Sequence, residues 1–313
     1  MAIIKFEDYI KLNKKEELVV GIGQFDGLHI AHRQIISVIE EIGKNKNFKT
    51  AIITFDPHPD FVLGKKEKIS NVMTLEEKAN ELELLGIDYL IIINFDINFS
   101  KVCAEDYVKE YLLKLNVKEV VVGSDFIFGS KGLGKGYMIS EYSNHLIKVN
   151  VIPEMKYENE KIGTEKIKEL LKQGDISKIN KLLGRNFMIS GIVVRGRQIG
   201  RKVGFPTINL VVREDFVEIK KGVYAVRVYH MNKQYNGIAN VGNNPSFNYK
   251  ERVNLEVHIF DFNEDLYDQL VSVELIDFIR EEVKFSSVDD FKEQLKQDIE
   301  KTLVILNKSV EKK

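Results

Sequence analysis

Two histidines, His29 and His32, lie three residues apart in the stretch GQFDGLHIAH at 23–32. They follow a glycine-containing turn and directly precede RQIISVIEEIGK, whose apolar period is typical of a helix. Residues three apart share one face of a helix, and the backbone N–H groups of its first turn have no partner within the helix. The pattern therefore predicts a phosphate site, at which imidazole donors neutralise phosphate oxygens. A surface or capping histidine pair is the alternative for an isolated HxxH.

Oxygen-bearing side chains in the second half of the chain form another candidate site. Thr207 and Asn209 in GFPTINL are two apart on an expected extended segment, so both project to one side as hard oxygen ligands. Such ligands suit Mg²⁺. Glu256 in VNLEVHIF interrupts an alternating apolar strand, on the side opposite to Leu255. It either points into the mouth of a barrel or faces solvent.

Short β-rich runs alternate with helical patterns in the first half. They are continuous apolar runs bounded by turns, as in strands buried on both faces of a parallel sheet. Between them, TLEEKANELELLG predicts a helix that Thr74 and Glu77 begin with a capping box. The alternation predicts a doubly wound parallel α/β domain. The expected strands are ELVVGIG (17–23), TAIITF (50–55), YLIIIN (89–94), EVVVGSDF (119–126) and LIKVNVI (146–152).

The pattern changes after about residue 153. Two short helical patterns, EKIKELLKQG and ISKINKLLG, lead into strand-like segments separated by glycine turns, which predict an antiparallel barrel or sandwich. A terminal helix follows, with Ser287 and Asp290 as its cap. Since 313 residues exceed the usual size of one domain, we expect two, at 1–183 and 184–313. The expected strands of the second are NFMISGIVVR, GVYAVRVYH, QYNGIANVG, VNLEVHIFDF and LVSVELIDFI.

The composition restricts the possible partners and compartment. With Lys+Arg 46 against Asp+Glu 47, the net charge of -1 gives no general attraction to nucleic acid or to an anionic membrane. Cys103 is the only cysteine, which excludes a disulfide framework and suits a reducing cytosol. The longest apolar stretches are far too short for a membrane helix, and MAIIKFEDYI lacks a signal-peptide pattern. We expect a cytoplasmic protein without nucleic-acid or membrane partners.

Motifs along almost the whole chain resemble a known family. GQFDGLHIAH resembles the first motif of the nucleotidyltransferase superfamily, and FDPHP with VVGSDFIFGSKGLGKG is similar to its bacterial FAD synthetase branch. The resemblance implies a bifunctional riboflavin kinase and FMN adenylyltransferase, with a Rossmann-like nucleotidyltransferase domain followed by an antiparallel β-barrel kinase domain and a terminal helix. It also implies Mg²⁺, ATP as co-substrate, and riboflavin, FMN, FAD and ADP as ligands. The motifs that resemble riboflavin kinase are, in order, LLGRNF, GRKVGFPTINL, GVYAV, GIANVGNNPSF, LEVHIFDFNEDLY and FIREEVKF.

For the first domain, the resemblance implies adenylyl transfer, in which the FMN phosphate attacks the α-phosphorus of ATP and pyrophosphate leaves. His29 and His32 would then act at the ATP phosphates. The resemblance places Gly23, Phe25 and Asp26 in the same ATP site, and Asp125, Phe126 and Phe128 near the flavin. Aromatic residues two apart after a strand are equally typical of core packing.

Three departures from the family pattern fall in the first half, and one of them is Gln24 in place of the usual asparagine of GNFDG. HIAH replaces H-x-G-H, so Ala31 carries a methyl group where glycine allows the closest approach of the backbone. IGTEKIK at 162–168 replaces the phosphate motif ISSTRIR. The resemblance gives Thr164, Lys166 and Lys168 to ATP, although lysine lacks the bidentate fork of arginine. A solvated helix face is the alternative for the two lysines.

For the second domain, the resemblance implies transfer of the ATP γ-phosphate to the ribityl 5′-hydroxyl of riboflavin. Gly204, Thr207 and Asn209 would bind Mg-ATP, and Glu256 would be the catalytic base. Arg280 in FIREEVKF would order the flavin side. Arg195, Arg197, Arg201 and Lys202 around GRQIGRKVG either attract ATP or are solvated.

Two other functions remain open on the sequence. One is a riboflavin kinase whose first domain is weak or inactive, which the departures in IGTEKIK favour. The other is a non-enzymatic protein that senses a flavin or a nucleotide. A sensor does not need Thr207, Asn209 and Glu256 together, and no nucleic-acid-binding motif is apparent.

Overall fold

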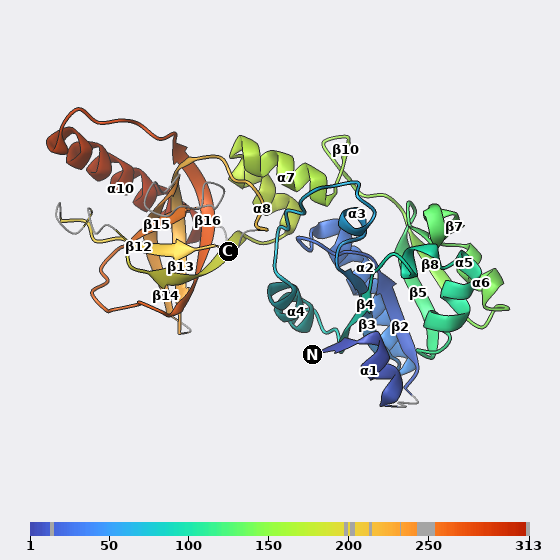
Figure 1. Ribbon diagram of the computed structural model, residues 1–313. Coiled ribbons are helices and arrows are strands. Elements are labelled where there is room, and N and C mark those ends of the chain that lie inside the picture. The colour runs from blue at the N-terminus through green and yellow to red at the C-terminus, as the bar shows by residue number, and fades with distance from the viewer. Residues whose placement is uncertain are drawn as a thin grey trace. The chain divides into compact units, whose positions relative to one another are not determined.

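The structure is a computed structural model that describes residues 1–12, 16–196, 200, 204–212, 215–231, 233–242 and 254–310. Contacts between Cα atoms divide the chain into two compact units, Met1–Thr164 and Glu165–Lys313. The first contains a parallel sheet and the second a closed barrel (Figure 1). The predicted fold class is confirmed.

Six parallel strands form the main sheet of the first unit, in the order β1-β4-β3-β2-β5-β8. Five of them are the predicted strands. The sequence analysis missed the edge strand β1, whose apolar run of three residues is shorter than those of the predicted strands and is mostly exposed. The strands are β1 (Ala2–Lys5), β2 (Leu18–Ile22), β3 (Lys49–Asp56), β4 (Tyr89–Asn94), β5 (Val117–Gly123) and β8 (Lys148–Ile152).

Helices and short turns cover both faces of this sheet. All five residues of β2 are buried. Val19 and Val20, which are consecutive residues of this strand, belong to two separate apolar cores on opposite faces of the sheet. This explains why the strand is a continuous apolar run. The helical elements are α1 (Phe6–Lys11), α2 (Ile30–Lys46), α3 (Pro59–Val62), α4 (Leu75–Leu84), η1 (Phe99–Lys101), α5 (Ala104–Tyr107), η2 (Val108–Leu112), η3 (Ser130–Gly132) and α6 (Met138–Tyr142). Two small hairpins pair β6 (Ile127–Phe128) with β7 (Gly134–Lys135), and β9 (Lys156–Tyr157) with β10 (Glu160–Lys161).

The predicted capping box of α4 is confirmed. The Glu77 backbone N–H donates to Thr74 Oγ1 at 2.8 Å, and the Thr74 N–H donates to Glu77 Oε2 at 2.7 Å. The buried face of α4 contains Ala79 and Leu82, and it also contains Lys78. A buried lysine in a helix next to the sheet requires a polar partner, which the site described below provides.

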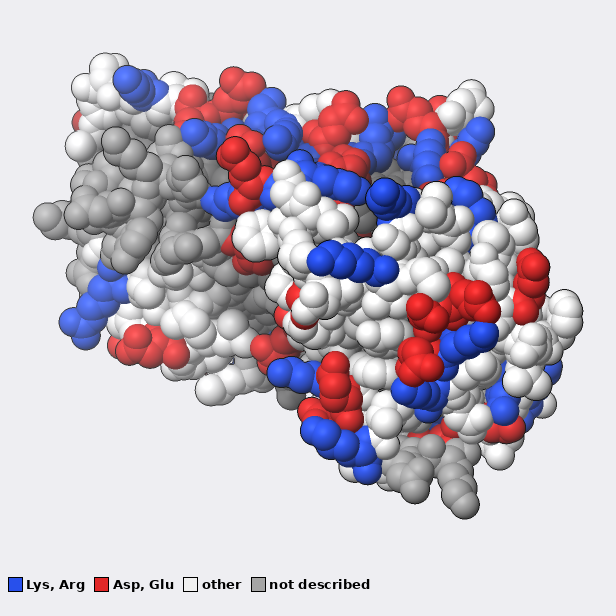
Figure 2. All heavy atoms as spheres, turned by 45° about the vertical axis from the view of Figure 1, so that its right-hand side comes forward, with Lys and Arg blue, Asp and Glu red and all other residues white. Residues whose placement is uncertain are grey.

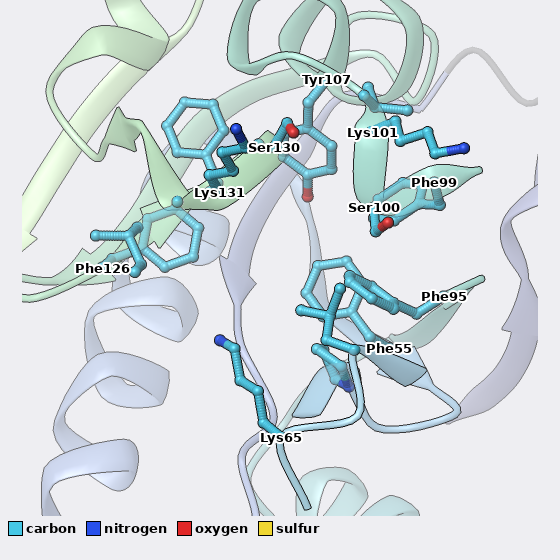
Figure 3. A pocket seen from close by; sticks show the side chains of 17 residues that line it. Phe55, Lys65, Phe95, Phe99, Ser100, Lys101, Tyr107, Phe126, Ser130 and Lys131 are labelled. Carbon is cyan, nitrogen blue, oxygen red and sulfur yellow. The ribbon is translucent and has the colours of Figure 1, made fainter. Parts of the chain in front are cut away.

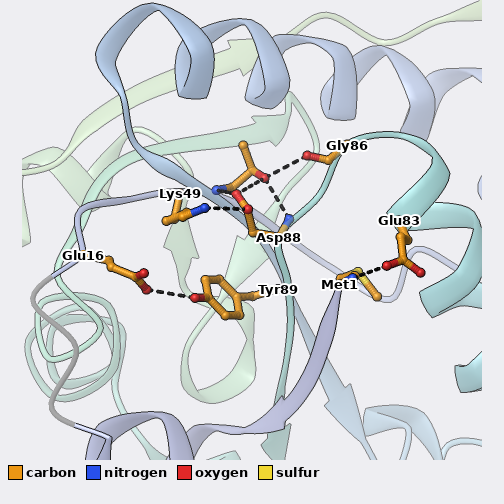
Figure 4. A network of polar contacts seen from close by, with 8 residues as sticks. Met1, Glu16, Lys49, Glu83, Gly86, Asp88 and Tyr89 are labelled. Carbon is orange, nitrogen blue, oxygen red and sulfur yellow. Dashed lines mark hydrogen bonds and ion pairs between the residues drawn. The ribbon is translucent and has the colours of Figure 1, made fainter.

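A polar network fastens the edge of the sheet where β3 and β4 begin (Figure 4). The Asp88 carboxylate accepts from the Thr50 backbone N–H at 2.9 Å and from Lys49 Nζ at 2.9 Å. Burial opposes ionisation of Asp88, but these hydrogen bonds hold its pKa below the ordinary value. Nearby, Tyr89 donates to Glu16 at 2.9 Å. The network lies at the end of the sheet opposite to the carboxyl ends of the strands, and so it leaves those ends to the candidate site.

The second unit is a closed six-stranded barrel in the order β11-β12-β15-β14-β13-β16, with all neighbours antiparallel. Each of the five predicted strand-like segments forms a strand of this barrel. The sixth strand, β12, comes from the predicted extended segment around Thr207 and Asn209. The strands are β11 (Phe187–Val194), β12 (Ile208–Val211), β13 (Gly222–His230), β14 (Lys233–Gly242), β15 (Asn254–Ile259) and β16 (Leu270–Arg280). The helices are α7 (Thr164–Gln173), α8 (Ile176–Leu183) and α10 (Val288–Val310).

Helix α10 contacts strands β13, β14 and β16 of the barrel. Its predicted cap is confirmed, because the Asp290 backbone N–H donates to Ser287 Oγ at 3.0 Å. Helices α7 and α8, which the sequence analysis placed in the first domain, belong by their contacts to the second unit. The domain boundary at 183 stays a prediction.

Charged side chains of both signs are interspersed over the described surface seen in Figure 2, in keeping with the net charge of -1. No helix in the part of the chain that the structure describes combines the length and the apolar character needed to cross a membrane.

Candidate functional site

The turn after β2 brings His29 and His32 together at the start of α2, as predicted. His29 is the N-cap residue, and its Nδ1 accepts the backbone N–H of His32 at 3.3 Å. The two rings stack with their centroids 3.6 Å apart and an interplanar angle of 15°. The capping interpretation and the phosphate-site interpretation are therefore compatible, because capping uses only one nitrogen of the His29 ring.

This turn has a strained backbone. Phe25 and Leu28 have φ values of 48° and 45°, in the left-handed region that non-glycine residues rarely adopt. Such residues cost about 1–3 kcal/mol each and persist where packing fixes them. Both side chains are buried, and the Phe25 ring packs on His32 at 4.8 Å. Gly21 makes room for this packing, since a Cβ there would lie 2.8 Å from Ile39, 2.9 Å from Ile52 and 3.1 Å from the Phe25 ring.

Both histidines are neutral at physiological pH. Burial lowers the pKa of His29 to about 4, with a further contribution from the charge of Lys161. Burial also lowers the pKa of His32 well below its ordinary value, helped by His29 and by the charge of Lys78. Because Nδ1 of His29 accepts a hydrogen bond, the proton of the neutral ring is on Nε2. His29 therefore has one N–H donor available for a ligand.

Asp26 ties this turn to two other segments. Its carboxylate accepts the backbone N–H groups of Val72 at 3.0 Å and Met73 at 3.3 Å. Its backbone carbonyl accepts from Thr164 Oγ1 at 2.9 Å. The structure thus gives Asp26 and Thr164 roles in positioning the turn, and contact of either residue with ATP stays a prediction.

Lys78 supplies a cation at the base of the turn. Its Nζ donates to the carbonyl oxygen of Gln24 at 2.6 Å, and its charge lowers the pKa of His32. The sequence analysis did not identify Lys78, because its position on the buried face of α4 depends on how that helix packs.

An aromatic cavity of about 710 Å³ opens at the carboxyl ends of β3, β4 and β5. In Figure 3, Phe126 lies on one side of it and Phe55 and Phe95 on the other. Phe126 and Phe128 stack with centroids 5.7 Å apart at 14°. The structure therefore places these two predicted flavin residues on a cavity wall. The sequence analysis missed the rest of the lining, which includes Phe55, Phe95, Phe99, Tyr107, Lys65, Lys101 and Lys131.

The histidine turn and the cavity lie at the same edge of the sheet. The turn follows β2, which lies between β3 and β5 in the strand order. The chain continues from β2 to β3 on one side, whereas β5 lies on the other side of β2. The strand order therefore reverses at β2, and ligands of open α/β sheets bind at such a switch point. Asp125, after β5, forms an ion pair with Lys161, and Lys161 in turn lowers the pKa of His29. Lys161 thus connects the predicted flavin side with the predicted phosphate side electrostatically.

The two lysines of IGTEKIK form ion pairs within their own helix. Lys166 Nζ lies 3.2 Å from Glu169, and Lys168 Nζ lies 3.6 Å from Glu165. Their contact with ATP stays a prediction.

In the barrel, the pairing of two strands brings the predicted kinase residues together. Asn209 on β12 lies directly opposite Glu256 on β15, and Asn254 donates to Glu256 at 3.3 Å. Thr207 and Glu256 line a pocket of about 360 Å³. Leu255 and Val257 are fully buried, so Glu256 lies on the opposite side of the strand from the apolar core. Asn209 is buried and confined by Gly196, where a Cβ would lie 2.3 Å from its Nδ2.

Arg280 lines the same pocket but is held by α10. Its Nε donates to the two carboxylate oxygens of Asp298 at 2.9 and 3.1 Å, and its Nη2 lies 2.7 Å from Oδ2. Asp298 is fully buried. Arg280 thereby fastens α10 to β16, and its contact with flavin stays a prediction. Gly204 has a φ of 92°, which favours glycine, whereas Arg197, Arg201 and Lys202 lie outside the described residues.

The comparisons with known proteins agree with this division into two sites. The family model for FAD synthetase matches residues 11–166, and the model for riboflavin kinase matches residues 183–306. The bifunctional riboflavin kinase/FMN adenylyltransferase of Listeria monocytogenes is 32% identical over 300 residues, which cover 96% of this chain and 94% of that protein. The chain belongs to this family.

Two further likenesses each cover nine tenths of the chain or more. The bifunctional riboflavin kinase/FMN adenylyltransferase of Buchnera aphidicola is 40% identical over 286 residues, covering 90% of this chain and 91% of that protein. A Streptococcus pneumoniae crystal structure described as a macrolide-efflux protein has a TM-score of 0.88 and 30% identity, and covers 96% of this chain and 99% of that one. The predicted pairing of a riboflavin kinase domain with an FMN adenylyltransferase domain is confirmed.

Two substitutions separate the capping role of His29 Nδ1 from the donor role proposed for its Nε2–H. In His29→Asn, the side-chain oxygen still accepts the His32 N–H, but the amide N–H groups do not reach the place of Nε2, so FAD formation from FMN falls by about 10²–10³ with little loss of stability. In His29→Gln, the longer amide keeps a donor but loses the cap, so stability falls by about 1 kcal/mol while more activity survives. Riboflavin phosphorylation in the same samples is the internal control. Turnover of His29→Asn within threefold of wild type would contradict the donor role.

The buried neutral histidines also predict a pH dependence of stability. The folded state holds the pKa of His29 at about 4, whereas the unfolded chain has the ordinary value of 6.5. Below 6.5 the unfolded chain therefore binds a proton that the folded chain excludes, and the free energy of unfolding falls as the pH drops toward 4. Urea unfolding of wild type and His29→Asn at pH 7.5 and pH 5 measures this effect. The fall is smaller in the variant; an equal fall in both proteins would show that His29 does not contribute.

Proposed function

We propose that this chain phosphorylates riboflavin to FMN in its barrel and adenylylates FMN to FAD in its first unit, with ATP as co-substrate of both steps. The observation that supports this most directly is that Thr207 and Glu256 line one pocket of the barrel and that Asn209 lies opposite Glu256 on the neighbouring strand. The neutral histidine pair beside an aromatic cavity supports the second activity.

In adenylyl transfer, the residues of the first unit position two substrates and compensate charge. The aromatic walls of the cavity suit the flat isoalloxazine ring of FMN, because stacked aromatic contacts bury a large area. His29 Nε2–H donates to a phosphate oxygen of ATP, and the FMN phosphate attacks the α-phosphorus as pyrophosphate leaves. Lys78 supplies positive charge near the turn, which the neutral histidines do not, whereas the charge of Lys161 is shared with its partners Asp125 and Glu154.

In riboflavin phosphorylation, Glu256 accepts the proton of the ribityl 5′-hydroxyl as the γ-phosphate is transferred. Thr207 and Asn209 hold the phosphate end of ATP. Their hydroxyl and amide oxygens fit Mg²⁺, which prefers oxygen ligands and takes most of its coordination from water and substrate phosphates. Bound Mg²⁺ would supply charge neutralisation for the phosphate. We assign both activities to the cytoplasm, which suits a chain with a single cysteine.

One incubation with riboflavin, ATP and Mg²⁺ tests the whole proposal. FMN, FAD and pyrophosphate all form if both activities are present. FMN without FAD or pyrophosphate would favour the kinase-only alternative, which the lysine–glutamate pairs of IGTEKIK support. Binding of flavin without any product would indicate a sensor.

The base assignment predicts a selective loss in Glu256→Gln. This substitution keeps size and hydrogen bonding but removes basicity, so kinase turnover falls by roughly 10²–10⁴. Riboflavin and ATP still bind, and FAD synthesis from supplied FMN proceeds at the wild-type rate. Turnover within twofold of wild type at saturating substrates would falsify the assignment, and a loss of thermal stability with weakened binding would indicate a structural role.

The cavity assignment predicts a change in FMN affinity. Phe126→Ala removes one wall, so the KM for FMN rises about 5- to 10-fold, as expected for roughly 1–1.5 kcal/mol of aromatic contact. Phe61→Ala is the matched control, because Phe61 is 52% exposed and lies outside the lining. If both variants keep the wild-type KM, FMN does not occupy this cavity.

A further inference from the structure

His258 lies on the same side of β15 as the proposed base. Asn254, Glu256 and His258 alternate with the buried residues of the strand, so their side chains share one face. His258 lines the same 360 Å³ pocket as Thr207 and Glu256. No role for this histidine follows from the mechanism proposed above.

The ring of His258 holds the segment that leads into β12. Its Nδ1 lies 2.7 Å from the carbonyl oxygen of Pro206. A carbonyl oxygen only accepts, so Nδ1 carries the proton and donates. Phe205 and Phe260 flank the ring edge-on, each with centroids 5.7 Å from it, which fixes the orientation of the donor.

The segment around Pro206 has few backbone hydrogen bonds to β15. Pro206 has no backbone N–H, so it cannot donate to the strand ladder. The ladder between β12 and β15 starts only at Ile208, which lies opposite Val257. Thr207 therefore lies just outside the ladder, and the bond from His258 holds the residue that precedes it. Phe205 is held from the other side, since its N–H donates to the Gly200 carbonyl at 2.8 Å.

We propose that His258 is a positioning residue of the kinase site, which through Pro206 holds Thr207 at the phosphate end of ATP. The inference rests on the proposed role of Thr207 in binding Mg-ATP. His258 acts through its Nδ1–H and does not touch the substrate. A displacement of about 1 Å at such a site costs up to about 10²-fold in rate, which sets the size of the effect.

Two amide substitutions separate positioning from direct substrate contact. The amide of asparagine reaches the place of Nδ1, and the amide of glutamine reaches the place of Nε2. If His258 acts through Pro206, His258→Asn stays within about threefold of wild-type kinase turnover. His258→Gln and His258→Ala then lose about 10- to 100-fold. Direct contact through Nε2 gives the opposite order for the two amides and overturns the proposal.

Binding measurements distinguish positioning from a general structural role. Calorimetry with ADP and Mg²⁺ gives an affinity about 10-fold weaker in His258→Gln than in wild type, while riboflavin affinity, measured by flavin fluorescence, stays within twofold. Equal weakening of both ligands, together with a lower melting temperature in all three variants, shows that His258 only supports the fold and overturns the inference. Wild-type ADP affinity in His258→Gln overturns it as well. A wild-type protein without kinase activity would instead refute the proposed function, so the two failures are distinguishable.

Discussion

Burial of the His29–His32 pair is the constraint on which the first unit depends. His29 stacks on His32, and His32 packs on Phe25, so both rings are removed from water and the loss of hydration lowers the pKa of both. Neutral rings allow the Nδ1 of His29 to cap α2, which a protonated imidazole cannot do because both of its nitrogens are donors. The short turn can place these rings together only with Phe25 and Leu28 in the left-handed region, and this backbone strain opposes folding.

The two units assemble their sites by different geometric rules. In the first, the carboxyl ends of parallel strands bring loops from β2, β3, β4 and β5 to one edge, so residues far apart in sequence line one cavity. In the barrel, the antiparallel register places Asn209 opposite Glu256, and strand parity keeps both away from the apolar core. The candidate site of the parallel sheet is thus built from loops, whereas that of the barrel combines strand residues with Thr207, which directly precedes β12.

These rules explain what the sequence could and could not predict. Continuous apolar runs are enough to locate five strands of the parallel sheet, and the HxxH spacing is enough to bring His29 and His32 together. Phe95 and Phe99 were missed as cavity walls, because their position depends on the strand order rather than on any local pattern. The sequence could have predicted that His258 lies near the site, since it is two residues from Glu256 on the same face of the strand.

Contacts between distant segments account for most of the other omissions. Asp26 accepts hydrogen bonds from the backbone N–H groups of Val72 and Met73, about forty-six residues away. No local sequence motif predicts these bonds. Arg280 and Asp298 belong to a strand and a helix whose packing alone brings them together. Both interactions occupy side chains that the family resemblance assigned to ligands. They show that a motif residue can also hold together the segments around a site.

The neutral histidines also change how the departures from the family pattern are understood. A phosphate site needs positive charge, and here the imidazoles supply donors but no net charge. Lys78 and Lys161 both lie close enough to lower a histidine pKa, so their charge acts at the turn itself. An anionic phosphate at this turn would oppose that effect and favour protonation of the rings. If ATP binds at this turn as proposed, phosphate binding and histidine protonation are linked, and Lys78 lies where its charge acts on the same group.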